Sequence, residues 1–194
     1  AAQTAPHLHT GSERPYPGTC RALDATLDPN RGGHRLAVEA LGEAAVCSWA
    51  DTWTGQQAED VRATCGDFLL GRPGAPSYQL AVVLDDAAMG ITDVVRGRDL
   101  AGSTARQRVL HTLLGHEVPR FAHHPLLLDD DARKLSKRDE ALTLKALRDH
   151  GVDAEQVIAR LAEAIGLAPP GTTRLTAEGF ASLLTDCPSW RDGT

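Results

Sequence analysis

The sequence predicts an α/β fold, and three observations favour it. A nearly continuous apolar run at residues 78–84 is bounded by turn-forming residues, as in a strand covered on both faces. Residues 91–96, 103–115 and 121–128 have the patterns of a strand, a helix and a strand, the order of a crossover unit in a parallel sheet. Amphipathic helical patterns follow from residue 142 onward. An α/β domain with a helical tail is therefore expected.

A strand pair is expected ahead of the crossover unit. Phe68–Leu70 and Tyr78–Leu84 are apolar, and residues 71–76 between them are rich in glycine and proline, which form turns. Asp85 and Asp86 then end the second strand. Two adjacent carboxylates resemble a catalytic pair, but ending a strand is their commoner use, and no chemistry is assigned to them.

The helix predicted at residues 103–115 has both end signals. Ser103 or Thr104 can cap its start, and Gly115 can end it. Its apolar side chains recur at the spacing of one helical face: Val109, Leu110, Leu113 and Leu114.

The flanking segments differ in character. Residues 1–66 show weak periodicity and predict an irregular module. Residues 142–151 and 154–167 predict two amphipathic helices with Gly151 and Gly166 near their ends, and a shorter helix is expected at residues 176–184.

Composition limits the functional classes. A chain of 194 residues with 42% hydrophobic residues can bury the core of one or two small domains. No apolar run is long enough to span a membrane and the N-terminal segment lacks a signal-peptide pattern, so a cytoplasmic location is expected. Four scattered cysteines predict reduced thiols, with Cys47 and Cys65 as packing residues. A net charge of -6 argues against general attraction to nucleic acid, although residues 96–108 and 133–138 are locally basic.

Residues 78–139 resemble a known enzyme family. They contain, in order, a tyrosine-led apolar run, Asp-Asp followed by Met-Gly, VVRGRDL, STARQ, PRFAHHPLLL and KLSKR. This succession resembles the second half of the class I catalytic domain in glutamyl-tRNA synthetases, and is most similar to the short glutamyl-Q branch of that family. The resemblance implies a Rossmann-like catalytic half in a ligase that uses ATP with Mg²⁺ to attach L-glutamate to the queuosine base of tRNA(Asp).

The resemblance also implies a division into three segments. Residues 1–66 are expected to be the remainder of an acceptor-binding, zinc-type insertion. Residues 67–140 are the C-terminal half of the catalytic domain with the KLSKR loop, and residues 141–194 are a helical tail like the region that contacts the tRNA stem. The sequence leaves the oligomeric state open.

The loop RKLSKR resembles the family's lysine-containing ATP loop. By that resemblance Lys137 is catalytic, neutralising the ATP phosphates as charge develops during adenylate formation, because a lysine is a compact charge on a flexible stem. Ser136 adds a hydroxyl and Lys134 a second charge for ATP binding. Without this context, a surface loop would be the preferred interpretation.

Tyr78 and Arg96 are expected to bind glutamate, again by resemblance. A guanidinium can fork onto a carboxylate, and a tyrosine hydroxyl can orient the other end of the ligand. The alternative is a core tyrosine and a surface arginine.

Tyr16 and Cys20 in YPGTC match half of the family's zinc site. The Cys-x-Cys half is absent, and two ligands cannot close a tetrahedral Zn²⁺ site. His7 and His9 are able in principle to complete one, but solvated histidines are the commoner interpretation.

The family's HIGH-type motif has no counterpart here, which leaves three hypotheses. The chain is an incomplete or inactive portion of a glutamyl-Q type enzyme, a fragment of an ordinary glutamyl-tRNA synthetase, or a non-catalytic tRNA-binding module derived from a synthetase. The first is favoured by residues 78–86 and YPGTC, while the 56 residues after Arg138 leave no room for a long anticodon-binding region.

Overall fold

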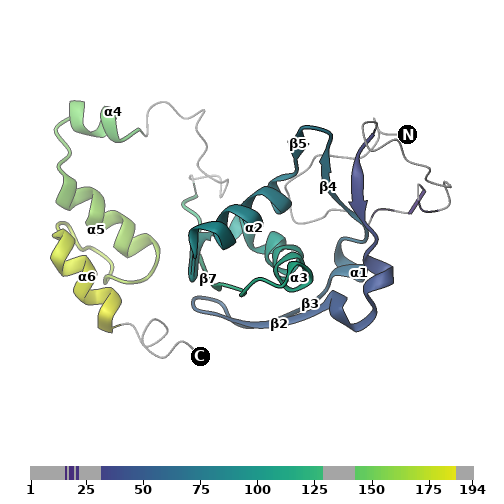
Figure 1. Ribbon diagram of the computed structural model, residues 1–194. Coiled ribbons are helices and arrows are strands. Elements are labelled where there is room, and N and C mark those ends of the chain that lie inside the picture. Colours follow the sequence, from purple (N-terminus) through teal and green to yellow (C-terminus); the bar gives the residue numbers. More distant parts are fainter. Residues whose placement is uncertain (1–15, 17, 20, 22–31, 129–142, 187–194) are drawn as a thin grey trace. The chain divides into compact units, whose positions relative to one another are not determined.

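The computed structural model describes residues 16, 18–19, 21, 32–128 and 143–186, and Figure 1 shows its elements along the chain. Contacts divide the chain into two compact units. The first comprises residues up to 95 together with 99–122, and the second comprises residues 96–98 together with 123–194. Among the described residues, no helix has the length and apolar character needed to cross a membrane.

The first unit contains a small antiparallel sheet. Strand β1 (His34–Leu36) pairs with β4 (Phe68–Arg72), and β4 pairs with β5 (Ala75–Pro76). Gly71 lets the β4–β5 hairpin close, because a Cβ there would stand 2.9 Å from the carbonyl oxygen of Ala75. The predicted turn is present, but the strand that returns from it is β5 rather than residues 78–84.

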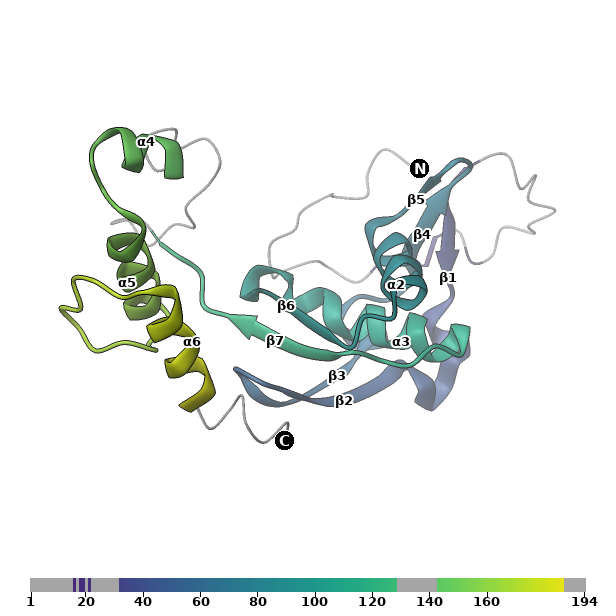
Figure 2. The ribbon, with the colours of Figure 1, turned by 60° about the vertical axis from the view of Figure 1, so that its left-hand side comes forward.

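A second sheet has four strands in the order β3-β2-β7-β6 (Figure 2). Strands β2 (Val46–Asp51) and β3 (Gly55–Asp60) form an antiparallel hairpin, and β2 runs parallel to β7 (Arg120–His124). Strand β6 (Asp93–Gly97) lies next to β7. The strands predicted at 91–96 and 121–128 correspond to β6 and β7, which are neighbours in this sheet, but β7 ends at His124 and residues 125–127 are not part of a strand.

The turn of the β2–β3 hairpin is held by a buried carboxylate. Asp51 is 2% exposed, and its Oδ1 accepts hydrogen bonds from the backbone N–H groups of Trp53 (3.0 Å) and Thr54 (2.9 Å). The backbone N–H of Thr52 donates to the carbonyl of Phe121 at 2.9 Å, which ties the turn to β7.

The predicted strand at residues 78–84 is wrong, because these residues begin helix α2 (Tyr78–Met89). The hydroxyl of Ser77 caps the helix by accepting from the Leu80 N–H at 3.3 Å, and Gly90 ends it in the left-handed conformation (φ 66°). An apolar run of this length suits a buried strand or a buried helix equally well, so its periodicity cannot decide. The cap and the terminal glycine decide for the helix.

The predicted helix before β7 is confirmed as α3 (Thr104–Leu114), which ends at Gly115 with φ 71°. Only part of its predicted apolar face is covered. Val109 and Leu110 are buried, whereas Leu113 and Leu114 are 45% and 44% exposed.

The core of the first unit lies among α2, α3 and the elements between residues 38 and 72. Helix α2 packs on α3, and η1 (Val38–Ala45) and α1 (Val61–Thr64) pack on each other. Cys47 and Cys65 are half-buried and pack against this core, which confirms their predicted packing role. The buried apolar side chains are Val38, Ala45, Val61, Phe68, Val83, Ala105, Val109 and Leu110.

Residues 34–64, where the sequence periodicity is weak, nevertheless form regular elements. Strands β2 and β3 belong to the same sheet as β7, and residues on both sides of position 66 share one core. The functional division at residue 66 stays a prediction.

The second unit confirms the predicted helical tail. Helices α4 (Leu144–Asp149), α5 (Ala154–Ala164) and α6 (Ala177–Asp186) follow one another, and α5 and α6 lie side by side in Figures 1 and 2. Gly151 and Gly166 follow α4 and α5 in the left-handed conformation, as expected (φ 79° and 76°).

An arginine fixes the segment that precedes α6 to the start of α5. Arg174 pairs with Asp153 at 2.7 Å and with Glu155 at 3.0 Å. Asp153 also forms a capping box with Gln156 at the first turn of α5, so one carboxylate serves both contacts.

Candidate functional site

Arg96, which was predicted to bind glutamate, lies on β6 and is held by a histidine on the neighbouring strand. Its Nε donates a hydrogen bond to Nε2 of His123 on β7, at 3.0 Å. His123 is 1% exposed and Arg96 is half-buried. An arginine nitrogen can only donate, so Nε2 of His123 is the acceptor and the imidazole is neutral, with its proton on Nδ1.

Tyr78, the other predicted glutamate ligand, occupies the first position of α2 and is 46% exposed. Its exposure contradicts a core tyrosine, which was the alternative interpretation. The prediction placed Tyr78 on a strand, whereas the structure places it at the start of a helix, directly after the capping residue Ser77.

The residue after Tyr78 anchors this helix to α3 through buried polar contacts. Nε2 of Gln79 donates to Oγ of Ser103 at 2.9 Å, and Nε2 of Gln107 donates to Oε1 of Gln79 at 2.9 Å. All three residues are buried. Because buried amides without partners cost free energy, this chain of bonds fixes the start of α2, and with it Tyr78, against the start of α3.

The other predicted site residues are placed only in part. Tyr78 belongs to the first unit and Arg96 to the second, so their pairing around one ligand stays a prediction. The predicted ATP-binding residues Lys134, Ser136 and Lys137 lie outside the described residues.

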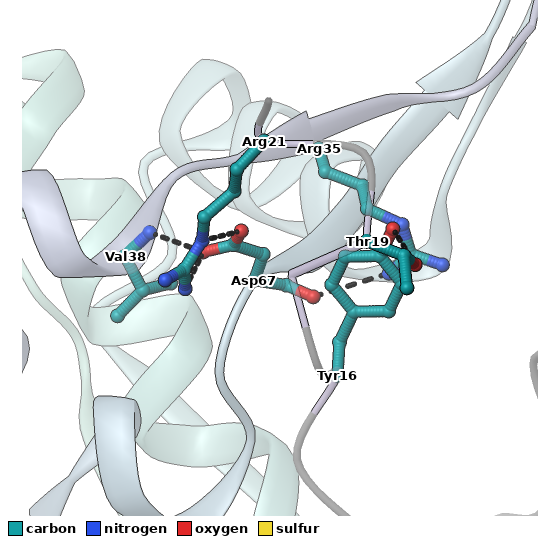
Figure 3. A network of polar contacts seen from close by, with 6 residues as sticks. All are labelled: Tyr16, Thr19, Arg21, Arg35, Val38 and Asp67. Atoms are coloured by element: carbon teal, nitrogen blue, oxygen red, sulfur yellow. Dashed lines mark hydrogen bonds and ion pairs between the residues drawn. The ribbon is translucent and has the colours of Figure 1, made fainter. Parts of the chain in front are cut away.

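Tyr16, predicted as half of a zinc site, belongs to a network of polar contacts shown in Figure 3. Its backbone N–H donates to the carbonyl of Cys65 at 3.1 Å, and its hydroxyl lies 3.0 Å from Oγ1 of Thr19. The guanidinium carbon of Arg35 stands 4.2 Å from the centre of its ring.

A buried carboxylate, Asp67, organises the same network. Arg21 donates to both of its carboxylate oxygens, at 2.6 and 2.8 Å, and the backbone N–H of Val38 donates to Oδ1 at 2.9 Å (Figure 3). Arg35 donates to the backbone carbonyl of Asp67 at 3.1 Å. The pKa of Asp67 is lowered, mainly by the hydrogen bonds from Arg21, while the burial of the Asp67 carboxyl acts in the opposite direction.

The described part of this network does not make up a zinc site. A cationic guanidinium lies over the ring of Tyr16, where it disfavours a second cation on the phenolate. No group of three or more His, Cys, Asp or Glu side chains suited to a metal occurs in the described part of the chain. Cys20, the other predicted ligand, is outside that part.

Comparison with known proteins identifies the class. The family model described as "tRNA synthetases class I (E and Q), catalytic domain" matches residues 56–182, and the chain belongs to this family. A glutamate-tRNA synthetase structure from Elizabethkingia anophelis shares the fold, with a TM-score of 0.53 at 24% identity over 73% of this chain and 36% of that one. The predicted α/β class I catalytic fold is confirmed.

Curated relatives narrow the resemblance to one enzyme. A glutamyl-Q tRNA(Asp) synthetase from Leptothrix cholodnii is 48% identical over 151 residues, covering 73% of this chain and 48% of the relative. The proteins of that name from Nocardia farcinica and Geobacter sulfurreducens are each 43% identical, covering 91% and 87% of this chain and 56% and 52% of their own lengths. The predicted glutamyl-Q resemblance is confirmed, and the chain spans about half the length of these relatives.

Sequence reasoning missed the residues that support the predicted ligands. His123, Gln79, Ser103 and Gln107 all lie within segments that carry the family resemblance, PRFAHHPLLL, the tyrosine-led run and STARQ, but no role was assigned to them. The available signal was the presence of these polar residues within the three family motifs, whereas the partner of each residue is set by the fold.

Proposed function

We propose that this chain forms part of an enzyme that activates L-glutamate with ATP and transfers it to the queuosine base of tRNA(Asp). The names of relatives that are 42–48% identical support this proposal. The observation in the structure that carries it is Arg96, a guanidinium held on β6 by a buried histidine. Such a group is suited to fork onto a substrate carboxylate.

Glutamate carries two carboxylates, which lets the enzyme hold one while the other reacts. In activation, a carboxylate oxygen attacks the α-phosphorus of ATP, the bond to pyrophosphate breaks, and pyrophosphate leaves with its Mg²⁺. In transfer, the glutamyl group passes to the queuosine base and AMP leaves. Arg96 and Tyr78 would hold glutamate during both steps.

The ATP phosphates gain charge as pyrophosphate departs. Lys137 would neutralise that charge chiefly in the transition state, and Lys134 and Ser136 would hold the nucleotide. A cytoplasmic location and zinc binding through Tyr16 and Cys20 stay predictions; neither enters these steps.

The first experiment measures glutamate-dependent exchange of pyrophosphate into ATP, followed by transfer of labelled glutamate to tRNA(Asp) with and without queuosine. Exchange together with queuosine-dependent transfer supports the proposal. Transfer to tRNA(Glu) instead would indicate a glutamyl-tRNA synthetase. Binding of tRNA without any exchange would indicate a non-catalytic module.

The second experiment tests Arg96 in the full protein that the gene encodes. Arg96→Ala is expected to weaken glutamate binding by about 1.5–3 kcal/mol, the range for a hydrogen bond to a charged group. Arg98→Ala is the matched control, because Arg98 is exposed and two residues away. Normal glutamate binding by the Arg96 variant, with a shallower salt dependence of tRNA binding, would instead make Arg96 a phosphate contact.

A further inference from the structure

We infer that His123 is a positioning residue that sets the plane of the Arg96 guanidinium for glutamate. This inference rests on the proposed function of Arg96. It starts from one contact, the 3.0 Å hydrogen bond from Nε of Arg96 to Nε2 of His123, made between neighbouring strands of one sheet.

The position of His123 makes it a rigid support. Its side chain is 1% exposed, and the preceding residues of β7, Phe121 and Ala122, are also buried. The Nε–H of an arginine is part of the planar guanidinium, so a fixed acceptor for that bond fixes the plane and the direction of the terminal nitrogens. A fixed plane loses less conformational entropy when it forks onto a carboxylate.

The chemistry of a neutral imidazole suits this role. An aspartate or glutamate at the same position would also accept from Nε, but its negative charge would oppose the approach of a substrate carboxylate. Nε2 of a neutral histidine accepts the bond and adds no negative charge. The residue type therefore orients the cation while preserving attraction for an anionic ligand.

The test compares three variants of the full protein in glutamate-dependent pyrophosphate exchange. His123→Leu removes the acceptor, and His123→Gln restores one, because an amide oxygen can accept from Nε. His124→Gln is the control, since His124 is the adjacent half-buried histidine, with its Nδ1 2.8 Å from the Pro125 carbonyl oxygen. We expect His123→Leu to raise the KM for glutamate by about tenfold, which corresponds to the loss of one hydrogen bond. The KM for ATP and kcat should stay within about twofold of the values of the parent protein. His123→Gln should recover most of that loss, and His124→Gln should resemble the parent protein.

Several results would overturn the inference. One is an unchanged KM for glutamate in His123→Leu; another is an equal rise in the KM values for glutamate and ATP, which indicates general damage. A folded His123→Gln protein with no recovery also opposes it. If His123→Leu does not fold, the Gln variant and a ¹⁵N spectrum of the parent protein decide: Nε2 of His123 must be unprotonated and Nδ1 protonated at neutral pH. A parent protein without glutamate-dependent exchange refutes the proposed function, while the spectrum still reports whether the contact exists.

Discussion

Substitution of Asp67 should destabilise the first unit by removing a buried acceptor that serves three segments of the chain. Its carboxylate joins Arg21 and the backbone N–H of Val38, and its own carbonyl accepts from Arg35. Asp67 is 4% exposed, whereas the side chain of Arg21 is 41% exposed. The two partners will therefore respond differently to the loss of the carboxylate.

The magnitude follows from that difference. In Asp67→Ala, water can solvate the exposed Arg21, so this partner adds little to the cost. The N–H of Val38 is buried and loses its acceptor, which costs about 1–3 kcal/mol. Asp67→Asn keeps an amide oxygen for the Val38 N–H, so we expect its cost to be clearly smaller than that of the alanine variant.

Urea denaturation followed by tryptophan fluorescence measures these changes, because Trp49 and Trp53 both lie in the first unit. The lowered pKa of Asp67 adds a pH signature. A carboxyl whose folded pKa is below its unfolded value stabilises the fold above the unfolded value, and that stability is lost as pH falls through the folded pKa. The difference in free energy of unfolding between the parent protein and Asp67→Asn should therefore be constant above about pH 5 and should decrease below about pH 4.

Asp93→Ala is the matched control for Asp67. Asp93 pairs with Arg120 at 2.7 Å, but the side chains of Arg120 and Asp93 are 65% and 44% exposed, so its removal should shift the unfolding midpoint far less. A similar loss of stability in the Asp67 and Asp93 variants would contradict a special role of the buried carboxylate, and so would a stability difference for Asp67→Asn that persists unchanged in acid.

Three further predictions concern the helices and the ATP loop. Gln79→Leu should lower the free energy of unfolding of the first unit, measured in urea, by about 2–3 kcal/mol, because Ser103 and Gln107 lose a buried hydrogen-bond partner. The double variant Gln79→Leu/Gln107→Leu should lose less than the sum of the two single variants, and a purely additive loss would contradict an energetic coupling between Gln79 and Gln107. Burial lowers the pKa of His111, so protonation of this histidine favours the unfolded state. Between about pH 8 and pH 5.5, the thermal midpoint of the parent protein should therefore fall more than that of His111→Gln. Equal falls in the two proteins would exclude His111 as the cause. Lys137→Ala should lower the kcat of exchange with the KM for glutamate nearly unchanged, and a variant altered only in that KM would contradict a transition-state role.

The sequence predicted the elements whose signals are local. Strands β6 and β7, helix α3 and helices α4 to α6 lie where periodicity and terminal glycines indicated. The β2–β3 hairpin was not anticipated, because Gly55–Asp60 is mostly polar and carries no apolar alternation. Its six-residue pairing with β2 comes from the neighbouring strand, not from its own composition.

The error at residues 78–84 shows which signal should carry more weight. Seven apolar or neutral residues in a row satisfy a buried strand, but Ser77 and Gly90 enclose 12 residues, which is long for a strand and ordinary for a helix. Burial at Gln79 and Val83, four residues apart, agrees with one helical face. For short apolar runs, the distance between a capping residue and a glycine discriminates better than the run itself.

The residues that support the site could not be predicted because their partners are distant in sequence. Arg96 and His123 are 27 residues apart, and Arg21 and Asp67 are 46 apart. Hydrogen bonds across such separations leave no periodic pattern; they exist only once the strands have been placed beside one another. Sequence motifs therefore identify the charged residues that are candidates for ligand binding. The neutral or buried residues that orient these charged residues are identified only from the folded structure. Under the proposed function, Arg96 supplies the attraction for the glutamate carboxylate, and the hydrogen bond from Arg96 to His123 sets the direction of the guanidinium.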